Sequence, residues 1–130
     1  MAKCLVLSVG LVKENYSKDD ILEYLKREVS RVAFEKLILF VSEETIESSL
    51  NEFFEYLEEN KIEFTVFPGE DKENMAYLNK VANAVLGFAN KDDGILFEVL
   101  YVSGFFVIKH IVAPTKEEKE EFRKGDPTNL

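Results

Sequence analysis

Tryptophan and glutamine are absent from this chain, and cysteine and histidine each occur once in its 130 residues. A single cysteine, Cys4, excludes an internal disulfide bond, which is typical of a reducing compartment and predicts a cytoplasmic protein. A zinc site would need more nitrogen and sulfur ligands than Cys4 and His110 supply. We therefore interpret Cys4 as a core residue and His110, which lies within an apolar run, as a structural one.

Glycine-rich phosphate-binding motifs are also missing. Gly10 is followed by LVKEN, so neither G-x-G-x-x-G nor the G-K-S/T ending of a P-loop occurs. The G-x-S-x-G motif of α/β-hydrolases is absent as well. These absences disfavour dinucleotide oxidoreductases, P-loop NTPases and serine hydrolases, and they leave no assigned catalytic residue and no expected cofactor.

Positive charge is scarce, because 16 lysine and arginine residues stand against 25 aspartate and glutamate residues, for a net charge of −9. Bulk nucleic acid binding depends on lysine and arginine that replace phosphate counterions, so the composition argues against it. A small anion remains possible, since helix N-termini and backbone amides hold phosphate without basic side chains. Few thermolabile residues beside abundant glutamate and lysine are typical of proteins from a thermophile.

Hydrophobic residues make up 46% of the chain and follow two periodicities. Apolar runs at 3–12, 36–41 and 62–67 predict three strands, the first two covered on both faces. The segments that follow each run have apolar residues at helical spacing, and the third such helix is expected to bury Met75, Leu78, Val81, Ala82, Val85 and Leu86. Ser17, Ser42 and Asp71 are placed to cap these helices. The order β-α-β-α-β-α predicts parallel strands joined by right-handed crossovers.

The most apolar segment, GILFEVLYVSGFFVIKHIVAP, spans residues 94–114. Its length approaches that of a membrane helix, but Glu98, Lys109 and His110 are costly at bilayer depth, so we expect no membrane partner. Its β-branched and aromatic residues around a central serine–glycine step predict a β-hairpin instead. That register places Glu98 opposite Lys109, a favourable pair of roughly 0.2–1 kcal/mol. Both faces of the hairpin are apolar, so helices or a second subunit must cover them.

The fold class predicted from these elements is α/β. We expect a three-layer, Rossmann-like domain over residues 1–114, with a mostly parallel sheet and a C-terminal antiparallel hairpin strand. Residues 115–130 are expected to form a charged C-terminal helix and tail. Thr115 and Glu118 make a capping-box pair at the start of that helix, and Gly125 is expected to end it.

Small residues and helix starts follow the predicted strands. Ligands of open parallel sheets bind at the carboxyl ends of the strands, an edge that we call the carboxyl edge. The candidate ligand-binding residues there are Ser8, Gly10, Ser42, Thr45, Ser103 and Gly104. Their amides suit a nucleotide-like anion, although serine and glycine are also ordinary cap and turn residues. Lys13, Lys72 and Lys109 are the nearest basic residues, and each is either a phosphate contact or a surface charge.

Acidic residues accompany the same edge: Glu43, Glu44, Glu70, Asp71 and Glu73. Carboxylates aimed at one point would hold magnesium for phosphodiester cleavage. Acidic residues in the first turn of a helix are, however, expected from the helix dipole alone. The sequence favours this second interpretation, so no metal ligand is assigned.

Three segments resemble CRISPR-associated Rossmann-fold (CARF) domains. LILFVSEETIESSLNEFFEYLEENKIEFTVFP is similar to the second strand, helix and third strand of that family, and LVLSVG (5–10) to its first-strand motif. YVSGFFVIK (101–109) stands where the family has a Thr-Gly-Gly or Thr-His-Gly signature, with Phe106 where a basic residue is frequent. The resemblance, over roughly residues 3–110, implies a dimeric sensor of cyclic oligoadenylate in antiviral defence. Some relatives also cleave that ligand without metal.

The leading hypothesis is therefore a ligand-binding or regulatory module that senses a nucleotide-like anion as a homodimer. Two alternatives stay open at this stage. One is a protein–protein adaptor that docks through the apolar hairpin, with Phe105 and Val107 as contact residues. The other is a metal-dependent phosphodiesterase that uses the acidic residues of the carboxyl edge. If the chain is an enzyme, a phosphodiesterase or ring-nuclease-like activity is the expected one.

Overall fold

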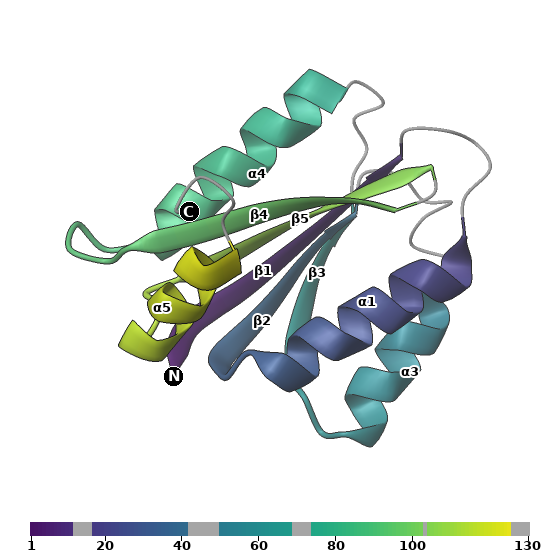
Figure 1. Ribbon diagram of the computed structural model, residues 1–130. Helices are drawn as coiled ribbons and strands as arrows, with labels where there is room; N and C mark the ends of the chain where they lie inside the picture. Colours follow the sequence, from purple (N-terminus) through teal and green to yellow (C-terminus); the bar gives the residue numbers. More distant parts are fainter. Residues whose placement is uncertain (12–16, 42–49, 69–73, 103, 126–130) are drawn as a thin grey trace.

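The structure is a computed structural model, and it describes residues 1–11, 17–41, 50–68, 74–102 and 104–125. The strands and helices alternate along the first part of the chain and end in a hairpin and a helix (Figure 1). In order they are β1 (Ala2–Leu11), α1 (Lys18–Arg31), β2 (Phe34–Val41), α3 (Asn51–Glu59), β3 (Phe64–Pro68), α4 (Asn74–Phe88), β4 (Ile95–Val102), β5 (Phe105–Val112) and α5 (Lys116–Gly125).

The five strands form one mixed sheet in the order β3-β2-β1-β5-β4. β1 pairs with β2 and β2 with β3 in parallel, whereas β1–β5 and β4–β5 are antiparallel. The prediction of a mostly parallel sheet is therefore only partly correct: the α/β class holds, but half of the pairings are antiparallel. The cause is the position of β5, which lies between β1 and β4 and pairs antiparallel with both, and this central position buries most of its side chains.

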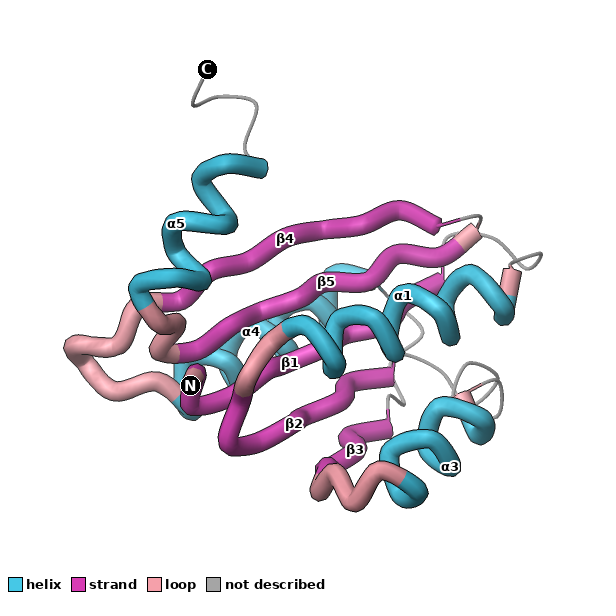
Figure 2. The backbone as a smooth tube through the Cα atoms, turned by 60° about the horizontal axis from the view of Figure 1, so that its bottom comes forward, coloured by secondary structure: helices cyan, strands magenta, loops and turns pink. Residues whose placement is uncertain are grey.

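Helices cover both faces of the sheet, as Figures 1 and 2 show. α1 and α3 pack on one face, where the main core gathers alternate residues of the strands. That core includes Leu5, Leu7, Val9, Ile21, Leu25, Leu37, Leu39, Phe53, Leu57, Phe105 and Val107. α4 packs on the opposite face against Cys4, Val6, Ile38, Phe40, Phe106 and Val112. The strands in the middle of the sheet are therefore buried on both sides, as the apolar runs predicted.

The first helix begins at its predicted cap. The Ser17 hydroxyl accepts a hydrogen bond from the backbone N–H of Asp20 at 3.3 Å, which caps α1. Ile21, Leu25 and Val29 are buried at helical spacing. The predicted caps Ser42 and Asp71 lie outside the described residues.

The buried stripe of α4 differs from the prediction. Val81 and Val85 are buried as expected, but the third member is Tyr77, while Ala82 is exposed and Leu86 is 65% exposed. Tyr77 lies four residues before Val81, so the three side chains share one face of the helix. Its hydroxyl reaches the sheet backbone, which fixes this face rather than the neighbouring one against the strands.

The apolar segment near the C-terminus is a hairpin, as predicted. Val102 pairs with Phe105, and the register continues to Glu98 opposite Lys109. The Glu98 carboxylate lies 3.6 Å from the Lys109 ammonium. In the turn, Gly104 has a φ of 87°, a left-handed conformation that glycine adopts without strain.

The C-terminal helix also begins as predicted. Thr115 Oγ1 accepts a hydrogen bond from the Glu118 backbone N–H at 3.2 Å and lies 3.1 Å from the Glu118 carboxylate. α5 extends to Gly125, the predicted end. Within the described part of the chain, no helix is long and apolar enough to cross a membrane.

Candidate functional site

Strand ends gather at the carboxyl edge. β1, β2 and β3 run in parallel, and β4 runs with them because both β1 and β4 are antiparallel to β5. Leu11 pairs with Phe105, so the end of β1 lies beside the turn between β4 and β5. α1 and α4 run back from this edge across the two faces of the sheet (Figure 1). The predicted convergence of the hairpin turn with the end of β1 is therefore present.

Three of the six candidate ligand-binding residues are described. Ser8 is wholly buried on the α4 side of β1. Gly10 is buried on the same side, two residues nearer the edge. Gly104 is half-buried in the hairpin turn. Ser42, Thr45 and Ser103 lie outside the described residues. Gly10 and Gly104 therefore both lie at the carboxyl edge, whereas Ser8 lies beneath it in the core.

Gly10 has a packing role. A Cβ atom at this position would overlap the ring of Phe106, which faces Gly10 from the neighbouring strand β5. The missing side chain thus lets an aromatic ring lie against the backbone of β1. This close approach closes the α4 side of the sheet just below the edge.

Gly10 and Phe106 form the floor of the carboxyl edge, and Tyr77, which was not predicted from the sequence, completes it. Its hydroxyl lies 3.1 Å from the carbonyl oxygens of both Val9 and Phe40, which lie near the ends of β1 and β2. Burial raises the pKa of the phenol, and the neighbouring Ser8 hydroxyl and Val9 carbonyl only partly offset that rise. Tyr77 is therefore a neutral hydrogen-bond donor that ties α4 to the strand ends. Its spacing from Val81 and Val85 was the signal in the sequence.

Lys109 lies away from the carboxyl edge, so its expected place among the nearest basic residues is wrong. It occupies the middle of β5, on the α1 side, and is 3% exposed. Its ammonium donates to the Glu28 carboxylate of α1 at 2.8 Å, and Arg27 and Arg31 lie within 4.0 Å of the same carboxylate. β5 runs away from the edge, which carries its fifth residue deep under α1. Lys13 and Lys72 lie outside the described residues.

Glu28 was missed in the sequence analysis, although its position was informative. It lies seven residues after Ile21 and three after Leu25, in the middle of the buried stripe of α1. A charged residue at such a position needs a partner of opposite charge inside the fold. The buried hydroxyl of Tyr24 lies near the same pair, and burial together with Glu28 and Glu98 raises its pKa.

The lone cysteine and histidine have different surroundings. Cys4 is buried in β1, as predicted, and burial raises the pKa of its thiol. His110 lies in β5 with its ring stacked 6.0 Å from that of Phe97. Burial lowers the pKa of its imidazole, which keeps the ring neutral near pH 7.

The described residues contain no cluster of three or more His, Cys, Asp or Glu side chains arranged to hold a metal ion. The acidic residues considered for a magnesium site, Glu43, Glu44, Glu70, Asp71 and Glu73, lie outside the described residues. The described structure therefore adds nothing in favour of metal-dependent chemistry.

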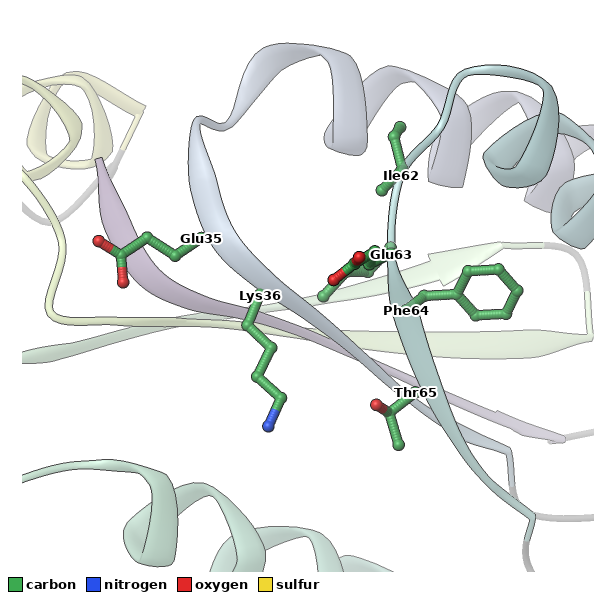
Figure 3. A pocket seen from close by; sticks show the side chains of 7 residues that line it. Glu35, Lys36, Ile62, Glu63, Phe64 and Thr65 are labelled. Atoms are coloured by element: carbon green, nitrogen blue, oxygen red, sulfur yellow. The ribbon is translucent and has the colours of Figure 1, made fainter.

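A hollow of about 380 Å³ lies at the opposite, amino edge of the sheet (Figure 3). Its wall comes from the first residues of β2 and β3 and the segment before β3: Glu35, Lys36, Leu37, Ile62, Glu63, Phe64 and Thr65. Lys36 points toward α4, where its ammonium lies 5.8 Å from the Phe88 ring. Two carboxylates and one ammonium on an open wall give this hollow no preference for an anion.

Comparison of the chain with models of protein families, with curated proteins and with solved structures finds no match. The similarity to CARF domains therefore stays a prediction. What the described residues offer is a carboxyl edge with a closed apolar floor, formed by Gly10, Phe106 and Tyr77.

Proposed function

We propose that the protein is a ligand-binding, regulatory module that senses a nucleotide-like anion at its carboxyl edge. One observation carries the proposal: the end of β1 and the turn between β4 and β5 lie side by side, at the edge from which α1 and α4 run back. Open α/β sheets bind ligands at this edge, and helix N-termini with backbone amides favour anions there.

In this proposal the candidate residues have two different roles. Ser8 and Gly10 are buried and belong to the floor, together with the rings of Phe106 and Tyr77. In the proposal, ligand contacts come from Ser42, Thr45, Ser103 and Gly104, which follow the ends of β2 and β4 in sequence. Cyclic oligoadenylate is the specific ligand that the CARF-like segments favour.

Calorimetry with inorganic phosphate, mononucleotides and cyclic oligoadenylates tests the proposal. We expect binding of at least one phosphorylated nucleotide with a Kd below about 100 µM, which corresponds to roughly −5.5 kcal/mol. Substitution Ser42→Glu or Ser103→Glu should weaken binding at least about tenfold, because a carboxylate repels the anion. Absence of heat with every phosphorylated compound would overturn the proposal.

Ser30→Glu is the matched control for these charge changes. Ser30 is exposed near the end of α1, at the amino edge, where its hydroxyl donates to the Lys26 carbonyl. This variant carries the same added charge but should bind the ligand like the wild-type protein. Equal losses in all three variants would assign the effect to net charge rather than to the carboxyl edge.

A second candidate, the protein–protein adaptor, is favoured by exposed apolar residues on the hairpin. The prediction that Phe105 and Val107 make the contacts of the adaptor is wrong, because both side chains are buried in the main core. The exposed side chains belong to β4 instead, where Tyr101 is 77% exposed. Tyr101→Lys should therefore abolish capture of a different protein while leaving the circular dichroism spectrum unchanged. An adaptor is excluded if this face only joins two copies of the chain.

A further inference from the structure

The strand β4 ends the sheet on one side. No other strand in the described residues pairs with its outer edge, so the outward N–H and C=O groups of a segment of eight residues are free to pair. The opposite edge strand, β3, has only five residues and ends at Pro68. A short strand and a proline both hinder pairing with another chain, and β4 has neither.

One face of β4 is also uncovered. Phe97, Val99 and Tyr101 alternate along the strand and are 60%, 41% and 77% exposed. They lie on the face of the sheet that carries α4, because their partners in β5 include Phe106 and Ile108, which pack with that helix. α4 itself packs against β1, β2 and β5 and lies behind β1 in Figure 2, whereas β4 lies outermost. An apolar strip beside a free edge marks an interaction surface.

We propose that this surface binds a second copy of the chain, through antiparallel pairing of β4 with β4 around a two-fold axis centred on Val99. In that register Val99 faces its own copy, and Phe97 faces Tyr101 of the second copy. The three exposed side chains of each copy then form one apolar cluster, in which aromatic cross-strand pairs are favourable. The two sheets join into a single sheet.

Charge favours this register over the one centred on the neighbouring residue, Glu98. Pairing centred on Glu98 would use as many residues, but it would set the two Glu98 carboxylates opposite each other, which is unfavourable. Pairing centred on Val99 places Glu98 opposite Leu100 instead. Glu98 points to the other face of the sheet, toward Lys109 at 3.6 Å, so its charge stays compensated within its own chain. The single charged residue of β4 therefore does not oppose self-association.

The same symmetry separates the two carboxyl edges. Because the paired strands run in opposite directions, the carboxyl edge of one copy points away from that of the other. Each chain would thus carry a whole candidate site, with one ligand per chain and no residue shared across the axis. This consequence rests on the proposed ligand binding, whereas the pairing itself does not.

Sedimentation and light scattering test the pairing without any ligand. We expect a mass of twice the 15.0 kDa of one chain. Val99→Lys should weaken association at least about tenfold, because it sets two ammonium groups opposite each other across the axis. Thr65→Lys is the matched control, since Thr65 is exposed on the other edge strand, β3, and should leave the dimer intact. A monomeric wild-type protein, or a dimer that Val99→Lys does not weaken, would overturn the proposal.

Cysteine cross-linking tests the register. Val99→Cys places the two new thiols on opposed residues, about 5 Å apart at Cβ, so a short thiol cross-linker should join the chains. Phe97→Cys places them about 13 Å apart along the strands, so it should react poorly alone and well in the double variant Phe97→Cys/Tyr101→Cys. The wild-type chain, whose Cys4 is buried, controls for background. Efficient cross-linking of Phe97→Cys but not of Val99→Cys would refute this register.

Discussion

The parallel strands β1, β2 and β3 and the hairpin strands β4 and β5 belong to one sheet but are covered differently. The crossovers between the parallel strands bring α1 and α3 onto one face of the sheet, and α4, which joins β3 to β4, covers the other face of β1 and β2. The turn between β4 and β5 brings no helix with it. The α1 side of the hairpin is covered by a helix from the other half, and the α4 side of β4 stays open. The apolar strip thus arises because topology leaves this face of β4 uncovered while its sequence places Phe97, Val99 and Tyr101 there.

The two halves also differ in buried charge. Among the described strands, β5 alone buries a charged side chain, Lys109, which pairs with Glu28 of α1. Desolvation of two charges costs free energy that their mutual attraction only offsets when the geometry is good. The contact between the hairpin and α1 should therefore respond more strongly than the parallel strands to loss of a single charged group.

The largest expected effect is at this ion pair. Lys109→Ala leaves Glu28 buried without its 2.8 Å partner and should lower the free energy of unfolding by about 3 kcal/mol. Lys36→Ala removes an exposed lysine from β2 in the parallel half and should cost less than about 0.5 kcal/mol. Urea denaturation of both variants makes the comparison. Equal, small losses would show that the two halves do not differ in this respect.

A smaller effect is expected where the two halves meet, between β1 and β5. Gly10→Ala overlaps the Phe106 ring and should lower the free energy of unfolding by about 1–3 kcal/mol. Gly87→Ala, in α4, meets no atom within 4 Å and should instead raise it by about 0.5–1 kcal/mol. Thermal unfolding followed by circular dichroism checks the opposite signs. A destabilised Gly87→Ala variant, or a Gly10→Ala variant like the wild type, would contradict the packing described here.

The smallest expected effect is the pH dependence that His110 gives to the hairpin. Burial lowers its folded-state pKa below the ordinary value of 6.5, so the unfolded chain takes up a proton first as the pH falls. Its contribution to stability is thus complete above pH 6.5 and is lost progressively below that value. His110→Leu should remove this part of the decline between pH 7.5 and pH 5.5. If the melting temperature falls equally in the variant and the wild type between pH 7.5 and pH 5.5, the assignment to His110 is refuted.

Much of the fold could be predicted from local patterns. Ser17 and Thr115 cap their helices as their spacing indicated, and the hairpin register follows from a two-residue turn and the Glu98–Lys109 pair. The site was harder. The sequence indicated which residues follow strand ends, but not that Ser8 is buried below the edge or that Gly10 accommodates an aromatic ring. Those facts depend on Phe106 and Tyr77, which come from distant parts of the chain.

By itself, the sequence determined the identity of the strands and helices and the register of the hairpin, because these depend on periodicity and on residues close together in the chain. Only the tertiary structure decided that β5 lies between β1 and β4, that Tyr77 rather than Leu86 faces the sheet, and that Glu28 pairs with Lys109. The physical reason is that strand order and helix facing are chosen by the total burial of apolar surface and charge across the whole fold. This total burial depends on residues far apart in the chain, so local sequence patterns do not predict it.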